Sequence, residues 1–313
     1  MANSPASRAP TPVRSEPVPN QGQRLNFEAA TAERIVLLDG GPTAETHVIG
    51  IGGGSMVAYT CRSPDKETDN EDTVAAIPYG PDAAVLVVAD GAGGLPAGRR
   101  ASRTAVTTLE ASLQTAISET TLLRTAILNG IEEANRAVLA LGGGSATTFT
   151  VVTIEGSIAR TYQIGDSEAI IVGQRGKVKA QTLAHSPTGF AVEAGFLGQR
   201  EALHHEERHL VSNFLGSSDM RIDMGANVTL NPFDTVLLAS DGLTDNLHFT
   251  EIVEVMRKGP LDAAAEALTR LAKRRMTVES KNQPSKPDDL SVILFRKNQK
   301  RVGRWKVPPD QVA

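Results

Sequence analysis

The sequence predicts an α+β fold in which helices cover antiparallel sheets, and two observations indicate it. Short β-type segments are too numerous and follow one another too closely to belong to alternating β-α units. One neighbouring pair, residues 168–172 and 177–183, is joined across Gln174-Arg175-Gly176 in the manner of a β-hairpin. We therefore expect layers of antiparallel sheet and helix.

The first half of the chain predicts strands followed by two helices. Apolar and alternating patterns place the strands at 47–52, 55–61, 72–78 and 83–89. Helices are predicted at 98–117 and 119–141. The second has one apolar face at helical spacing, formed by Leu123, Ile127, Ile131, Ala134, Val138 and Leu141. The glycines at 142–144 end it.

The second half is predicted to be mostly sheet, closed by helices and a last strand. Besides the hairpin, strands are expected at 147–154, 158–164, 234–240 and 290–295. Two helical patterns lie between the last two strands, at 250–257 and 261–276.

We expect one folded domain with an arm at each end. Residues 1–25 are rich in Pro, Ser and Arg and are predicted to be a disordered arm. Residues 26–296 form the predicted domain, and 297–313 a basic tail around Trp305.

Composition excludes several classes of protein. The 313 residues include 32 Lys and Arg against 36 Asp and Glu, a formal net charge of −4, which argues against nucleic-acid binding by bulk charge. The longest apolar runs are far shorter than the roughly 20 residues that a membrane-spanning helix needs. Cys61 is the single cysteine, so an internal disulfide is impossible. With no secretory h-region visible, we expect a cytoplasmic protein with no membrane or nucleic-acid partner.

Acidic motifs stand at the ends of several predicted strands. Asp90-Gly91 follows 83–89, Gly165-Asp166-Ser167 follows 158–164, and Asp241-Gly242 follows 235–240. Asn70-Glu71-Asp72 and Asp288-Asp289 stand at strand starts. If these carboxylates meet at one rim of a sheet, they form an oxygen-rich cluster of the kind that suits Mg²⁺ or Mn²⁺ better than zinc.

A single Asp-Gly pair is a turn far more often than a ligand, and Asp39-Gly40 is read as such a turn. The full set is different. Two like charges about 4 Å apart repel by about 4 kcal/mol at an effective dielectric of 20, so gathered carboxylates need divalent cations. The sequence alone leaves open whether they gather.

These motifs together resemble the metal-dependent protein phosphatases of type 2C, in their bacterial form. The resemblance runs in order from Asn70 to Arg296. It rests on Asn70-Glu71-Asp72, Asp90-Gly91-Ala92-Gly93-Gly94, Ala146-Thr147-Thr148, Gly165-Asp166-Ser167, Ser240-Asp241-Gly242-Leu243-Thr244-Asp245 and Asp288-Asp289-Leu290-Ser291-Val292. The stretch from His185 to Gly195, with Leu215-Gly216 beyond, resembles the family's flap.

The resemblance implies a layered α-β-β-α sandwich and a centre of two Mn²⁺ or Mg²⁺ ions. Asp90 would bridge the ions, Asp241 and Asp288 would complete the first site, and Glu71 with the Gly91 carbonyl the second. Asp166, with Asp241, is a candidate for a third, weaker site. Asp72 would orient metal-bound water, so that catalysis is assigned to Asp90, Asp241 and Asp72.

The implied activity is hydrolysis of phosphoserine and phosphothreonine in proteins by metal-activated water. The expected partners are phosphoproteins made by a signalling serine/threonine kinase, and we expect a monomer.

The sequence departs from the family pattern at three positions. Glu67 stands where an arginine usually holds the substrate phosphate, so we expect either that Lys66 or Arg62 replaces it after a local shift or that substrate capture is weak. Ala92 replaces a common His or Met, and Asp289 replaces Asn. Two alternatives therefore stay open: a catalytically weak phosphoprotein-binding regulatory module, and a metal-dependent phosphatase of small molecules.

The remaining candidate groups favour structural readings. His204, His205 and His209 lie near Glu206 and Glu207, but their spacing matches no ordinary zinc pattern, so an exposed helix or flap is predicted. Cys61 lacks the Cys-x5-Arg context of a cysteine phosphatase and is expected to be an ordinary strand residue.

Overall fold

The computed structural model describes residues 35–41, 43–92, 97–278, 280 and 283–298. The predicted arm at 1–25 lies outside these residues, as does the tail beyond residue 298. Gly93 and Gly94 of the second acidic motif also lie outside them. No helix among the described residues has the length and hydropathy needed to cross a membrane.

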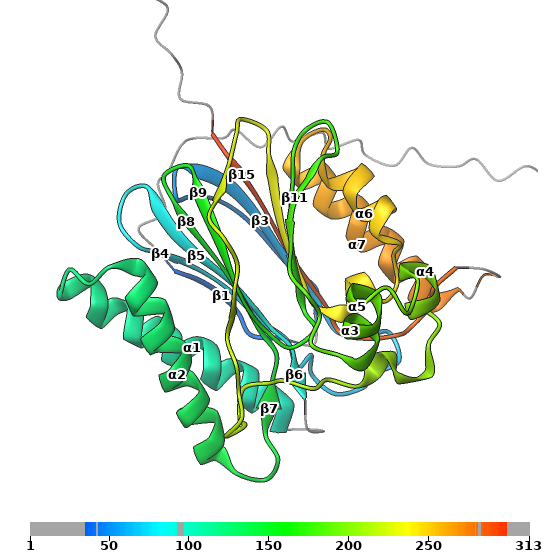
Figure 1. Cartoon of the computed structure of the whole chain (residues 1–313), viewed down its shortest axis with the longest axis horizontal. Coiled ribbons are helices and arrows are strands. Elements are labelled where there is room, and N and C mark those ends of the chain that lie inside the picture. Colours follow the sequence, from blue (N-terminus) through cyan, green and yellow to red (C-terminus); the bar gives the residue numbers. More distant parts are fainter. Residues whose placement is uncertain (1–34, 42, 93–96, 279, 281–282, 299–313) are drawn as a thin grey trace, which may run out of the picture.

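Two antiparallel sheets face each other at the centre of the fold (Figure 1). The first has the order β1-β4-β5-β8-β9-β12, with β13 also paired to β9. Its strands are β1 Val36–Leu38, β4 Thr73–Pro78, β5 Ala83–Ala89, β8 Phe149–Glu155, β9 Ile158–Ile164, β12 Asp223–Met224 and β13 Val228–Thr229.

The second sheet has the order β11-β10-β14-β15-β3-β2. Its strands are β2 Glu45–Ile51, β3 Gly54–Cys61, β10 Glu168–Val172, β11 Val178–Gln181, β14 Thr235–Ala239 and β15 Leu290–Lys297. A two-stranded ribbon, formed by β6 Gly91–Ala92 and β7 Ala146–Thr147, begins directly after Asp90.

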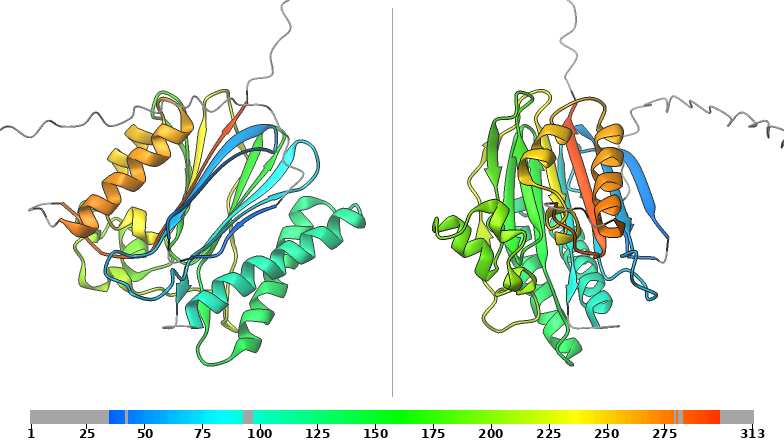
Figure 2. Two further views of the ribbon diagram at one scale, coloured as in Figure 1. Left: turned by 180° about the vertical axis from the view of Figure 1, so that it is seen from behind. Right: turned by 90° about the vertical axis from the view of Figure 1, so that its right-hand side faces the viewer.

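Helices cover the outer face of each sheet (Figure 2). On one side lie α1 Ala97–Ser118 and α2 Leu123–Leu141, and on the other α6 Phe249–Met256 and α7 Leu261–Thr277. Three buried apolar clusters separate the four layers, two beneath the helices and one between the sheets. The predicted layered α-β-β-α sandwich is therefore confirmed.

Strand β5 shows how the sequence fixes the layers. Its side chains alternate between the cluster under α1 and α2, with Val85 and Val87, and the cluster between the sheets, with Leu86 and Val88. Because both faces are buried, the strand reads as a continuous apolar run. Because β5 is buried on both faces, it holds Asp90, the residue that directly follows it, in a fixed position.

Short elements surround the rim where the acidic motifs lie. The flap contains α3 Pro187–Glu193, α4 Gln199–Ala202 and the 3₁₀ turn η1 Glu206–His209. A short helix, α5 Asp241–Thr244, begins directly after β14. Figure 1 shows α3, α4 and α5 on the same side of the molecule.

One predicted helix start is wrong. The helix expected from residue 119 begins at Leu123, because Thr120 adopts a positive φ of 55° and Thr121 N–H donates to the carbonyl of Ala116, ending α1. The turn lets α2 fold back against α1. The hairpin predicted at 168–183 is confirmed by the antiparallel pairing of β10 and β11.

Candidate metal centre

The structure brings the acidic motifs to one rim of the sandwich. Asp90 follows β5, Asp166 follows β9, Asp241 begins α5, Asp72 precedes β4 and Asp288 precedes β15. Burial raises the pKa of Asp90 well above its ordinary value, and the charges of the other four carboxylates raise it further. The gathering that the sequence left open therefore takes place.

The Ala146-Thr147-Thr148 motif holds the backbone of Asp90. Thr148 N–H and the Thr147 hydroxyl both donate to the Asp90 carbonyl, at 2.8 Å each. Asp90 N–H in turn donates to the Thr148 hydroxyl oxygen at 2.9 Å. The Thr148 hydroxyl also bonds the Ser167 hydroxyl, at 2.7 Å. Asp90 and the Asp166 loop are thus joined through one side chain.

Asp72 is buried and is held from the opposite sheet. The Ser240 hydroxyl donates to Asp72 Oδ2 at 2.9 Å, and Ser240 Oγ accepts from Ser291 N–H at 3.0 Å. Burial and the charge of Asp289 raise the pKa of Asp72 well above its usual value, although the serine hydrogen bonds oppose the rise. Asp72 Oδ1 has no hydrogen-bond partner in the part of the chain described.

Glu71 and the Gly91 carbonyl meet beside the start of α1. A Cβ placed on Gly98 would lie 2.6 Å from Glu71 Oε1 and 2.6 Å from the Gly91 oxygen. Both oxygens therefore border one small space that only glycine leaves open. Glu71 Oε1 has no hydrogen-bond partner among residues 35–298 that are described.

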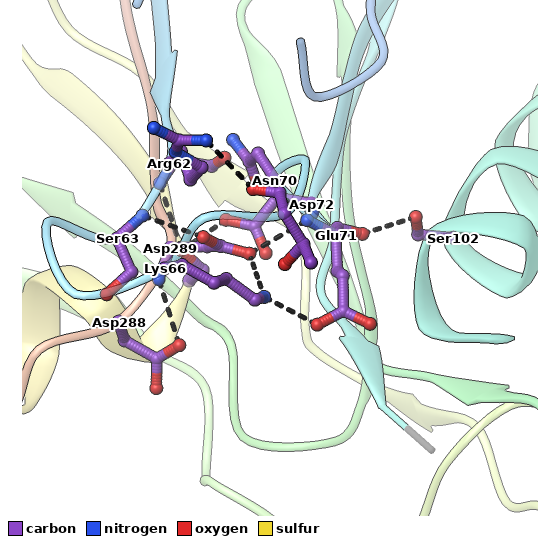
Figure 3. A network of polar contacts seen from close by, with 12 residues as sticks. Arg62, Ser63, Lys66, Asn70, Glu71, Asp72, Ser102, Asp288 and Asp289 are labelled. Atoms are coloured by element: carbon purple, nitrogen blue, oxygen red, sulfur yellow. Dashed lines mark hydrogen bonds and ion pairs between the residues drawn. The ribbon is translucent and has the colours of Figure 1, made fainter. Parts of the chain in front are cut away.

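Lys66, Glu71 and Asp289 form one ion-paired group, which we call the Lys66 half of the site (Figure 3). Lys66 Nζ lies 2.5 Å from Glu71 Oε2 and 2.7 Å from Asp289 Oδ2. Asp289 also accepts the N–H groups of Ser63 and Glu71, each at 2.8 Å. Hydrogen bonds to Asp289 and Glu71 raise the pKa of Lys66 although its burial lowers it. Asp289 is therefore a structural anchor.

Lys286 gathers a second group, the Lys286 half, with Asp241, Asp245 and Asp288. Its Nζ lies 2.5 Å from Asp241, 2.9 Å from Asp245 and 3.2 Å from Asp288. Burial and the charge of Asp241 raise the pKa of Asp288 to about 7 and that of Asp245 to about 6, against the opposing charge of Lys286. Burial and the charges of Asp241 and Asp245 also raise the pKa of Asp166.

The donor set of these residues fits a hard divalent cation. Every side-chain donor is a carboxylate oxygen, as Mg²⁺ and Mn²⁺ prefer, and buried oxygens of Glu71, Asp72 and Asp241 are left unpartnered by the described residues. Within those residues no three His, Cys, Asp or Glu side chains already stand in a metal-holding arrangement. The ammonium groups of Lys66 and Lys286 lie among the carboxylates instead.

The two residues expected to replace the phosphate-binding arginine are engaged elsewhere. Lys66 is paired within its half of the site. Arg62 Nη1 donates to the carbonyls of Glu67, at 2.8 Å, and Thr68, at 3.3 Å. Their assignment to substrate phosphate stays a prediction, and the structure shows both with other partners.

The structure adds residues that sequence reasoning did not single out. They are Asp245 and Lys286 in the ion-paired group, and Gly98 beside Glu71. Asp245 was visible as the last residue of its motif, whereas Lys286 and Gly98 carry no motif signal. The histidines predicted to lie in an exposed flap do so, since η1 ends at His209 and has no buried residue.

A cavity of about 370 Å³ opens from the centre. Its lining includes Asp166 and Asp241, the apolar side chains of Ile170 and Ile252, and Val192 of the flap helix α3. The rim is thus accessible from a space large enough for a peptide side chain.

Comparison with known proteins identifies the family. The model of the family described as "Protein phosphatase 2C" matches residues 64–282. Protein phosphatase PhpP of Streptococcus pneumoniae is 30% identical over 243 residues, which cover 75% of this chain and 94% of that protein.

Solved structures share the fold. The Streptococcus agalactiae serine/threonine phosphatase matches with a TM-score of 0.65 and 26% identity, covering 82% of this chain and all of that one (100%). The catalytic domain of the phosphatase PstP, solved with two manganese ions, matches in fold with a TM-score of 0.60 and 23% identity, over 81% of this chain and 99% of that one. Together with the ordered motifs and their convergence, these matches show that the chain belongs to the protein phosphatase 2C family.

Proposed function

We propose that this protein hydrolyses phosphoserine and phosphothreonine in phosphoproteins and that it requires two Mn²⁺ or Mg²⁺ ions. The proposal is supported by the four carboxylates whose charges act on buried Asp90, and these come from different strand ends, strand starts and a helix start. When these carboxylates are ionised, their mutual repulsion favours the binding of cations between them. Family membership supports the reaction class, and phosphoproteins made by a serine/threonine kinase are the substrates we expect.

The acidic residues would each have a specific place in holding the two ions. Asp90 would be shared by both ions, Asp241 and Asp288 would hold one, and Glu71 with the Gly91 carbonyl the other; Asp166 would serve a third, weaker site. A bound pair of divalent ions supplies a water of lowered pKa and neutralises phosphoryl oxygens.

Asp72 is suited to orient that water. Ser240 fixes its Oδ2, while Oδ1 is left without a partner among the described residues. A carboxylate held by one oxygen and free at the other can accept a hydrogen bond in a fixed direction. Asp72 would therefore orient that water through Oδ1, with Oδ2 held by Ser240.

The direct test is hydrolysis of a phosphothreonine peptide by the purified chain, with Mn²⁺ and with EDTA. We expect turnover that depends on the metal and that Asp90→Asn abolishes. Asp39→Asn is the matched control, because Asp39 pairs with Arg103 and is not among the carboxylates whose charges act on Asp90.

The same assay separates the alternatives. Activity confined to phosphorylated sugars and nucleotides would assign a small-molecule phosphatase. Mn²⁺ binding with no turnover of any phosphoester, together with saturable phosphopeptide binding, would assign a regulatory module. Either result would contradict the proposed function.

A further inference from the structure

Lys286 lies at the centre of three carboxylates that belong to two different segments. Asp241 and Asp245 are contributed by α5 and the residue that caps it, and Asp288 comes from the segment before β15. Only 19% of the Lys286 side chain is exposed. One ammonium group thus faces three acidic side chains in a largely desolvated place.

The side chain of Asn246 fixes the backbone of Lys286 by hydrogen bonding both its N–H and its carbonyl. Asn246 is fully buried, at 0% exposure. Its side-chain oxygen accepts Lys286 N–H at 2.8 Å, and its side-chain nitrogen donates to the Lys286 carbonyl at 2.8 Å and to the Gly242 carbonyl at 3.0 Å. Arg275 donates to the carbonyl of Asn246 at 2.8 Å. Lys286 is therefore built into this position and is not a surface lysine that reached it by chance.

Lys286 contacts two of the carboxylates to which the proposed function assigns an ion. At Asp288 it occupies the oxygen that does not accept Asp289 N–H, whereas at Asp241 Oδ1 is left without a hydrogen-bond partner by the described residues. The ammonium group of Lys286 contacts Oδ2 of Asp241 and Oδ2 of Asp288. An ammonium group has donors and no lone pair, so it cannot coordinate a metal and cannot share these oxygens with a cation in the same space. Its four-carbon stem is flexible, however, so the group can swing away while the backbone stays fixed.

We propose that Lys286 is an internal counter-cation that competes with divalent ions for Asp241 and Asp288 and thereby sets the metal affinity of the centre. Lys286 keeps the carboxylates together in the metal-free protein. The free energy of metal binding therefore includes the cost of displacing its ammonium group. The inference rests on the proposed function, since it concerns the same metal centre.

Lys66 does not have this role. Its partner Asp289 is not a proposed ligand and is anchored by two backbone N–H groups, and the Glu71 oxygen that faces Gly91 is free of it. Lys66 can therefore keep its contacts when Glu71 binds an ion. Removal of the two lysines should change metal affinity differently.

The test is calorimetric titration of Mn²⁺ into metal-free wild-type protein and Lys286→Met. We expect Lys286→Met to bind Mn²⁺ about tenfold more tightly, equivalent to about 1.4 kcal/mol, because the competing charge is gone. Lys286→Arg keeps the charge and should stay near the wild-type affinity. Lys258→Met is the matched control, since Lys258 is an exposed lysine paired with Glu254.

A second readout covers a variant that does not fold without metal. Protein prepared with Mn²⁺ is mixed with a fluorescent chelator, and Lys286→Met should release its ions more slowly than wild type. Equal or weaker Mn²⁺ binding by Lys286→Met, or equal or faster release, would overturn the inference while leaving the proposed function intact. Wild-type protein that binds no Mn²⁺ would overturn both.

Discussion

The Lys66 half and the Lys286 half of the site both place a lysine among buried carboxylates, but they balance the negative charge to different extents. In the Lys66 half, one acidic partner, Asp289, is 3% exposed and receives two backbone hydrogen bonds besides the lysine. In the Lys286 half, three carboxylates share one lysine, and burial with mutual repulsion raises the pKa of two of them. In the first half Asp289 is fully paired and Glu71 keeps one oxygen unpartnered by the described residues, whereas the second half holds excess negative charge that a divalent ion can neutralise.

The largest expected effect comes from Asp90, which would share one ion with ligands of each half. Asp90→Asn should lower metal-dependent turnover by about 10³-fold or more, because electrostatic stabilisation of the phosphoryl transition state depends on ions that Asp90 would share. In EDTA the same variant should melt at a higher temperature than wild type, since it removes a buried charge that four neighbours repel. If the variant kept its turnover, or melted at a lower temperature than wild type in EDTA, the assignment of Asp90 to the metal centre would be contradicted.

Gly98→Ala should damage the Lys66 half alone. The new Cβ would lie 2.6 Å from both Glu71 Oε1 and the Gly91 carbonyl, so these oxygens must move apart. We expect turnover to fall about 10- to 100-fold, as for other changes that disturb ligand orientation, while alanine favours the helix itself. Steady-state kinetics at several Mn²⁺ concentrations measure the effect, and Arg100→Ala, an exposed change in the same turn of α1, is the control.

Lys66→Met should reduce stability by about 2 kcal/mol with or without Mn²⁺, because it leaves the buried Asp289 without its cation. Urea denaturation of Lys66→Met, Asp289→Asn and the double variant should give a coupling free energy of about 1 to 3 kcal/mol. Additive effects would show that the two side chains are independent and would contradict the account of this half.

The Lys286 half predicts the pH dependence of the metal-free protein. Asp288 and Asp245 have pKa values of about 7 and about 6, above those of the unfolded chain, so the folded protein binds these protons more tightly. Lowering the pH from 8 to 5 in EDTA should therefore raise the melting temperature by a few degrees. The rise should be smaller in Asp288→Asn, and a fall of the melting temperature over this range would contradict the prediction.

The smallest expected effect concerns phosphate capture. Glu67 stands where the family usually has an arginine, and its backbone carbonyl accepts Arg62. Glu67→Arg should lower KM for a phosphopeptide several-fold with little change in kcat, because it exchanges an anion for a bidentate phosphate donor. A Glu67→Gln variant separates removal of the negative charge from the gain of the donor, and an unchanged KM in both would place phosphate capture elsewhere.

Much of the fold and of the candidate site could be predicted from the sequence because their signals are local. The boundaries of β5 and β9 were predicted to the residue, since the continuous apolar run of β5 ends at Asp90 and β9, which mixes polar and apolar residues, ends before Gly165-Asp166. The five acidic motifs were visible for the same reason. The turn at Thr120 was missed because a helical apolar pattern continues through it and tertiary packing of α2 on α1 decides the break.

Lys286, Asn246 and Gly98 could not be predicted in this way. Lys286 reaches Asp241 across 45 positions of sequence, and Asn246 reaches the backbone of Lys286 across 40. Gly98 matters because the start of α1 lies beside Glu71, and no local sequence pattern predicts this proximity. Roles of this kind depend on contacts between segments that only the folded chain brings together.

The most direct test of the account is a crystal structure of the protein soaked with Mn²⁺, with the ions located by anomalous scattering. We expect two manganese ions bridged by Asp90. One is also bound by Asp241 and Asp288 and the other by Glu71 and the Gly91 carbonyl, while Lys286 is turned away and Lys66 still contacts Asp289. Lys286 still seated among its three carboxylates, with no manganese bound at Asp90, would contradict this expectation.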